Sequence, residues 1–131
     1  CKEEARSVDT AGSNRFIDVL AFDPKSPKAY LIDPTVRFES NRDVEAEVDT
    51  DKRSIYERCI ESYKNRYSQM EPREYEVIPL WFGARGCVSD QVDEFFERFH
   101  LDKNKMFDIA RDVLADTCNM VRRFINHVNK K

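Results

Sequence analysis

The sequence predicts an α/β domain in which a small mixed β-sheet is flanked by helices. Two short apolar runs near the N-terminus are joined by a turn-rich connector and predict a β-hairpin. A stretch with helical spacing and a third apolar run follow, and two further helical patterns complete the chain. This order of hairpin, helix, strand and two helices allows either an α/β or an α+β arrangement, and we predict the former.

Length and composition describe one well-charged domain. The chain has 131 residues, of which 36% are charged, and its net charge of −3 gives no general signal of nucleic-acid binding. The four cysteines, Cys1, Cys59, Cys87 and Cys118, are too scattered for a zinc site or a disulfide framework. We therefore expect free buried thiols in a reducing intracellular compartment. No segment has the length of a membrane span, and a chain that begins at Cys1 is expected to be part of a longer protein.

The hairpin is predicted from the pattern of residues 16 to 38. Phe16–Phe22 is apolar except for Asp18, and Ala29–Ile32 is apolar and followed by Asp33. The connector between the two runs holds two prolines and an Asp-Pro step, which are turn signals. The second strand is expected to continue beyond Pro34. The polar residues 1–14 are expected to be an entry segment with little fixed structure, and the domain is expected to span 15–131.

The remaining elements follow in order. Residues 41–49 are acidic and are expected to form a solvated loop. A helix is predicted from Asp49 or Thr50 to about Tyr67, where an apolar stripe recurs at steps of three and four. Glu71-Pro72 ends it. Further predictions are a strand over 75–82, a helix over 88–100 and a strongly amphipathic helix over 106–128 that completes the core.

Two aspartates mark the hairpin as a candidate site. Side chains alternate along a strand, so Asp18 is expected to share a face with Phe16, Leu20 and Phe22. A carboxylate in an apolar strand is costly to bury unless it is paired or binds a cation. Asp18 and Asp33 are therefore expected to converge on a divalent metal, or else to be two aspartates that flank a turn. Lys52, one turn before Tyr56, is predicted to point toward the strand ends or to be a solvated lysine.

Several segments together resemble a known family. The segments are RFIDVLAF, AYLIDPTVRFE, DKRSIYERCIESYKNRY and YEVIPLWFGARGCV, which cover roughly residues 14 to 90. They resemble the restriction-like endonuclease domain of non-LTR retrotransposon polyproteins, a member of the PD-(D/E)xK nuclease superfamily. The interval between Asp18 and Asp33 is similar to that between the two metal-binding acids of the family. The resemblance implies a restriction-endonuclease-like fold.

The resemblance also implies roles for single residues. Asp18 and Asp33 would ligate Mg²⁺ or Mn²⁺, and Lys52 would be the catalytic lysine displaced to the helix. The implied activity is a DNA nick that primes reverse transcription. DNA would be one partner and the rest of the polyprotein, with its reverse transcriptase and RNA, the other. The implied location is the nucleus, with no membrane association.

The chain departs from the family pattern at two positions. Ile17 replaces a proline that bears no ligand, and Thr35 occupies the usual place of the lysine. If Lys52 does not substitute for that lysine, Arg37 or Lys64 must. Glu39 and Arg85 are further candidates, for the metal or its water and for phosphate respectively. The alternative function is a catalytically inactive nuclease-fold module that binds nucleic acid or protein.

Overall fold

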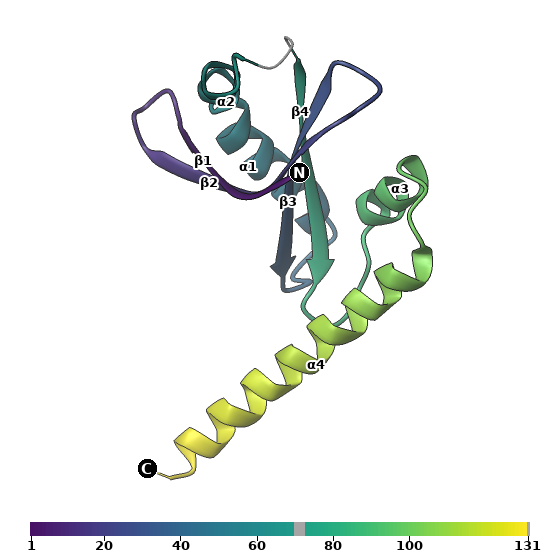
Figure 1. Cartoon of the computed structure of the whole chain (residues 1–131). Coiled ribbons are helices and arrows are strands. Elements are labelled where there is room, and N and C mark those ends of the chain that lie inside the picture. The colour runs from purple at the N-terminus through teal and green to yellow at the C-terminus, as the bar shows by residue number, and fades with distance from the viewer. Residues whose placement is uncertain (70–72, 131) are drawn as a thin grey trace. The chain divides into compact units, whose positions relative to one another are not determined.

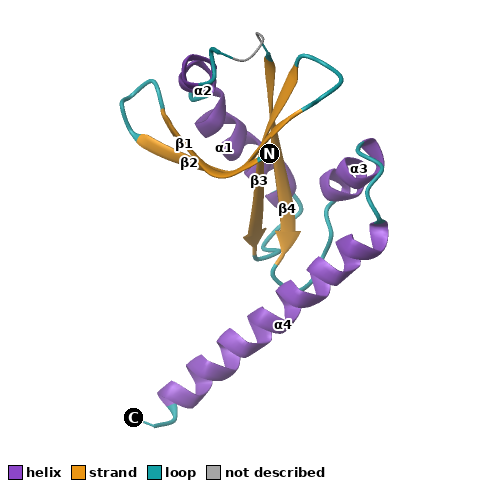
Figure 2. Ribbon diagram, in the orientation of Figure 1, coloured by secondary structure: helices purple, strands orange, loops and turns teal. Residues whose placement is uncertain are grey.

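A computed structural model describes residues 1–69 and 73–130, and it confirms the α/β class. The elements in chain order are β1 (Lys2–Val8), β2 (Asn14–Phe22), β3 (Lys28–Arg37), α1 (Val44–Glu57), α2 (Ile60–Arg66), β4 (Glu74–Gly83), α3 (Asp90–Arg98) and α4 (Lys103–Val128). The strands form one sheet in the order β1-β2-β3-β4 (Figures 1 and 2). The predicted helix end at Glu71-Pro72 lies outside the described residues.

The sheet is mixed, as predicted. β1 pairs antiparallel with β2, and β2 pairs antiparallel with β3, which confirms the hairpin. In Figure 1 the arrows of β3 and β4 point the same way, as expected for neighbouring strands joined by a helical crossover. The crossover here is α1 and α2. Pro79 lies within β4, so the predicted third strand forms despite its proline.

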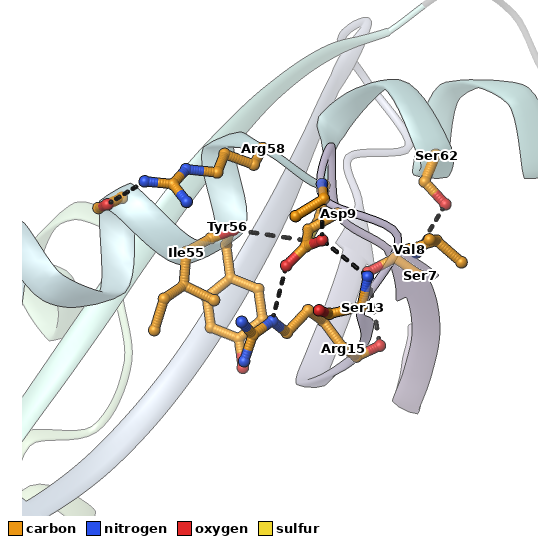
Figure 3. Close-up of polar contacts among 12 residues, drawn as sticks. Ser7, Val8, Asp9, Ser13, Arg15, Ile55, Tyr56, Arg58 and Ser62 are labelled. Carbon is orange, nitrogen blue, oxygen red and sulfur yellow. Dashed lines mark hydrogen bonds and ion pairs between the residues drawn. The ribbon is translucent and has the colours of Figure 1, made fainter.

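The expectation of little fixed structure in residues 1–14 is wrong, because Lys2–Val8 is a paired strand. Only Ala5 and Ser7 of β1 are buried, and they alternate with exposed residues as expected for a strand. Because one is small and the other polar, the alternation gives no hydrophobic pattern in the sequence. The turn after β1 is built on Asp9, whose carboxylate accepts the N–H groups of Ala11 and Ser13 and pairs with Arg15 at 3.1 Å (Figure 3).

The predicted helix over 49–67 is two helices, and it begins earlier than expected. α1 begins at Val44, so the expectation of a solvated loop over 41–49 is wrong. Val44 and Val48 are both buried and lie one turn apart on the helix. Their burial on one face stabilises the helix despite the acidic residues between them. The chain turns at Arg58 and Cys59 before α2 begins at Ile60. No glycine or proline marks this break in the sequence.

The chain forms two compact units. The first contains residues 1–34 and 46–80, and its core includes Ile17, Leu20, Leu31 and Tyr63, each 0% exposed. Ile17 and Leu20 lie three residues apart in β2, so the strict alternation predicted for this strand is interrupted between them. By register, Glu4 of β1 lies opposite this interruption, and its φ of 47° is in the left-handed region.

The second unit contains residues 35–45 and the chain from Trp81 onward. Ser89 caps α3: its hydroxyl donates to the carbonyl of Trp81 at 2.8 Å and accepts the N–H of Val92. The prediction that the last helix completes the core is wrong for most of its length. Met106 and Ala110 are the buried residues of α4, whereas most of its later apolar side chains, from Leu114 onward, are exposed.

The cysteines differ in part from expectation. All four are free, but Cys59 alone is buried, and the other three are exposed. Among the helices of the described residues, none combines the length and apolar character needed to cross a membrane.

Candidate active site

The register of the hairpin brings the two predicted acids face to face. The paired residues of β2 and β3 run from Phe22 with Ala29 to Val19 with Ile32. The same register continued by one position sets Asp18 opposite Asp33. Directly opposed residues of antiparallel strands project to the same face. The two carboxylates therefore lie at one point of the sheet, as the sequence predicts.

Asp33 is the buried member of the pair, with 3% of its surface exposed. The Lys52 ammonium lies 2.7 Å from its Oδ2 atom, and the Tyr56 hydroxyl lies 3.4 Å from its Oδ1 atom. That hydroxyl also donates to the carbonyl oxygen of Phe16 at 2.9 Å. The site thus joins β2, β3 and α1 through side chains of a single compact unit.

The helix presents Lys52 and Tyr56 together because they are four residues apart and occupy one side of α1. Lys52 does reach the hairpin, where its ammonium pairs with Asp33. Asp33 lies inside β3 and not at the strand end to which Lys52 was predicted to point. The predicted place of Lys52 in the first turn is wrong, since α1 begins eight residues earlier, at Val44. Tyr56 is a residue of the site that the sequence analysis does not select. Its spacing from Lys52 was the available signal for a polar role.

The charges of the site act on one another. Partial burial, followed by the negative charge of Asp33 and that of Glu4, raises the pKa of the Asp18 carboxyl, and the Lys52 ammonium offsets part of this rise. Burial, with the charges of Asp33 and Asp18, also raises the pKa of Tyr56, so its phenol stays protonated at neutral pH. The two acids thus form a site where added positive charge is favourable.

The donor set suits a hard divalent cation. Asp18 is exposed and Asp33 is buried, so the pair offers carboxylate oxygens on both the solvent and the protein side. Mg²⁺ is commonly held by one or two carboxylates, with water and substrate phosphate completing its shell. Within residues 1–69 and 73–130, no group of three or more His, Cys, Asp or Glu side chains forms a larger site. Glu4, which sequence reasoning did not select, is a further acid whose charge raises the pKa of the Asp18 carboxyl.

The other predicted site residues lie elsewhere. Lys64 is exposed on α2 and pairs with Glu61 of the same helix at 3.6 Å. Glu39 and Arg85 belong to the second unit and bind each other: the Glu39 carboxylate pairs with Arg85 Nε at 3.1 Å and accepts the Arg85 backbone N–H. Arg37, at the end of β3, is in that unit as well.

Comparison with known proteins gives no match: neither a protein-family model, nor a curated protein, nor a solved structure matches the chain significantly. The residues that bear on function are therefore those the structure brings together, namely Asp18, Asp33, Lys52 and Tyr56.

Proposed function

We propose that this chain is a metal-dependent DNA endonuclease domain of the kind found in non-LTR retrotransposon proteins. The observation that carries the proposal is the juxtaposition of Asp18 and Asp33 on adjacent strands, with the Lys52 ammonium 2.7 Å from Asp33. Two carboxylates on adjacent strands and one lysine are the groups that phosphodiester hydrolysis by this superfamily requires. The pieces of sequence that resemble the family carry all three of them.

Asp18 and Asp33 are the residues that would hold Mg²⁺ or Mn²⁺. When bound, such an ion polarises the phosphodiester and lowers the pKa of a coordinated water. The ion pair with Lys52 and the burial of Asp33 limit the freedom of the Asp33 side chain, and the Tyr56 hydroxyl lies 3.4 Å from its Oδ1 atom. Lys52, whose side chain is 22% exposed, brings a fixed positive charge to the place where negative charge develops on the phosphate.

The product would be a nick with a 3′-hydroxyl that primes reverse transcription, with the rest of a polyprotein as partner. DNA is the substrate in this proposal. The chain carries a net charge of −3, so its own affinity for DNA is expected to be low and to fall steeply with salt. Target choice would then rest with other domains of the parent protein.

A second function has an observation in its favour. Lys52 already balances the charge of Asp33, so the site is stable without a metal, and Thr35 replaces the usual lysine. The domain would then be an inactive nuclease-fold module that binds nucleic acid or protein. Isothermal calorimetry with Mn²⁺ separates the two functions: a nuclease site binds Mn²⁺ and loses it in Asp18→Asn, and an inactive module gives no heat in either protein.

The activity test is nicking of supercoiled plasmid at low salt with Mg²⁺ or Mn²⁺, using this chain and the longer parent protein. Asp18→Asn and Asp33→Asn are expected to abolish nicking, and Lys52→Ala to slow it about 10²–10³-fold, the usual effect of losing one stabilising donor. Lys64→Ala is the matched control on α2 and should keep the parental rate. Nicking at the parental rate by both aspartate variants would falsify the proposal.

A further inference from the structure

The C-terminal part of α4 exposes an apolar seam with heptad spacing. Phe107, Leu114, Val121 and Val128 recur at intervals of seven, and each is at least 41% exposed. The intermediate positions are Ala110, Thr117 and Phe124, and Phe124 is 68% exposed. Apolar residues at the a and d positions of a heptad are the pattern by which α-helices pair.

The seam borders a groove in the second unit. The groove, of about 510 Å³, is lined on α4 by Leu114, Val121 and Ile125 among others, and on its other side by Phe38 and Arg85. The Arg85 guanidinium stacks on the Phe38 ring at 5.0 Å and pairs with Glu39, so this wall is held in place by its own contacts. Ala110 is buried in the second unit, so the part of the seam that is available to a partner lies C-terminal to Ala110.

The seam is complementary to itself when two copies run antiparallel. With Asn119 at the centre, Leu114 of one helix faces Phe124 of the other, and Thr117 faces Val121. The two-fold axis repeats both pairs, which gives four layers that each join an a position to a d position. This is the layer pattern of an antiparallel pair, and it follows from one uninterrupted heptad assignment of the helix.

The charges of α4 favour the same direction. Between Asp108 and Asp116 the helix carries three aspartates and one arginine, a net charge of −2. At its other end the helix carries Arg122 and Arg123, and Lys130 follows just beyond it, which together give a net charge of +3. An antiparallel pair sets the acidic segment of each copy beside the basic segment of the other, whereas a parallel pair sets like charges together.

We propose that α4 is a homodimerisation helix and that the groove between α4 and the Phe38–Arg85 wall receives the α4 helix of a second copy, antiparallel and centred near Asn119. The occupant is this same chain because the exposed seam and the charge pattern both complement themselves. The interface is short, so the dimer is reversible, with a dissociation constant on the order of 10–100 µM.

Sedimentation equilibrium of the full chain tests the proposal. The weight-average mass is expected to rise with concentration from 15.5 kDa toward twice that value. Val121→Glu at the centre of the seam is expected to keep the chain monomeric, since it places one charge in each of the two central layers. Asn119→Glu, on the opposite side of the same helix, is the control and should dimerise as the parent does. A parent chain that stays monomeric at about 1 mM overturns the proposal.

The direction of pairing has a separate test in a background with Cys1, Cys87 and Cys118 replaced by serine. A mixture of a Leu114→Cys chain and a Phe124→Cys chain is expected to give a mixed disulfide on oxidation, because these positions face each other only in an antiparallel pair. Each chain alone should stay largely uncrosslinked. Efficient crosslinking of each variant with itself, with no mixed disulfide formed when the two are combined, indicates a parallel pair and overturns the antiparallel assignment.

Discussion

Lys52 and Asp33 form an ion pair of 2.7 Å in which the aspartate side chain is 5% exposed and the lysine side chain 22% exposed. The pair joins α1 to β3 inside the first unit. Because Asp18 lies opposite Asp33 by register, the Lys52 ammonium is the cation of a site that contains two carboxylates. The balance of charge at this point decides both the stability of the unit and the affinity of the site for cations.

Removal of the ammonium is expected to destabilise the chain and to increase its response to metal. Lys52→Met keeps the length of the side chain but leaves the buried Asp33 carboxylate without its nearest cation, at a cost of about 2 kcal/mol. Mg²⁺ or Mn²⁺ should then raise the melting temperature more in Lys52→Met than in the parent, because a bound ion stabilises the folded state. Thermal melts with a metal titration measure both effects.

The control for this experiment is the double variant Asp18→Asn/Lys52→Met. It lacks one of the two proposed ligands, so its melting temperature should not respond to the metal. Equal metal shifts in the parent, Lys52→Met and the double variant would mean that the ions bind elsewhere, and the metal site at Asp18 and Asp33 would then be wrong.

The Tyr63 hydroxyl is expected to stabilise β1. It donates to the carbonyl of Ala5 at 2.9 Å, and Tyr63 is 0% exposed. Tyr63→Phe removes the donor and leaves a buried carbonyl without it, so unfolding should become easier by about 1–2 kcal/mol in urea. Tyr75→Phe, whose ring stacks on that of Tyr63 but is only half-buried, is the matched control. Unchanged amide protection of β1 in Tyr63→Phe would contradict this role.

The sequence predicts an element correctly where the apolar residues of its pattern are also the residues that the structure buries. The hairpin, β4 and the last two helices were predicted within a few residues, because their apolar runs are bounded by turn signals. β1 was missed because its buried positions are Ala5 and Ser7, which no hydrophobic pattern reveals. The start of α1 was missed because acidic residues surround Val44 and Val48.

The candidate site was predicted in part for a similar reason. Asp18, Asp33 and Lys52 stand out as charged residues in or near apolar elements, and the structure brings them together. Tyr56 and Glu4 were not selected, since a tyrosine in an apolar stripe and a glutamate in a polar segment are ordinary on sequence grounds. Glu39 and Arg85 lie within the resembling segments, but they form an ion pair with each other and not with the Asp18–Asp33 site.

Asp9 is expected to make stability depend on pH in acid. Hydrogen bonds from Ser13, Arg15 and Ala11 lower the pKa of its carboxyl below the ordinary value of 3.8, so the folded state favours the ionised form. This contribution is fully present above pH 3.8 and is lost as the pH falls through the lowered pKa. Asp9→Asn should therefore melt earlier than the parent at pH 6, and the difference should shrink below about pH 4.

The matched control for Asp9 is Asp116→Asn, an exposed aspartate on α4. It should change the melting temperature little at either pH. A difference between Asp9→Asn and the parent that is the same at pH 6 and at pH 3 would show that the carboxylate charge does not hold the turn.

Gly83 is expected to be required because its hydrogen faces the Glu39 carboxylate. A Cβ at this position would overlap the Glu39 carboxylate group and would lie 2.8 Å from Cβ of Cys87. Gly83→Ala must therefore push Glu39 away from the backbone N–H and the Nε atom of Arg85, at a cost of about 1–3 kcal/mol. Urea denaturation followed by circular dichroism measures this change in stability.

A double-mutant cycle shows whether Glu39 is the cause. Glu39→Ala alone loses the pair with Arg85, whose guanidinium is largely exposed, and should cost little. In the Glu39→Ala background the alanine at position 83 no longer meets the carboxylate, so Gly83→Ala should cost less there than in the parent, by about 1 kcal/mol. Equal costs in the two backgrounds would assign the strain to Cys87 and to the backbone and would show that Glu39 is not its cause.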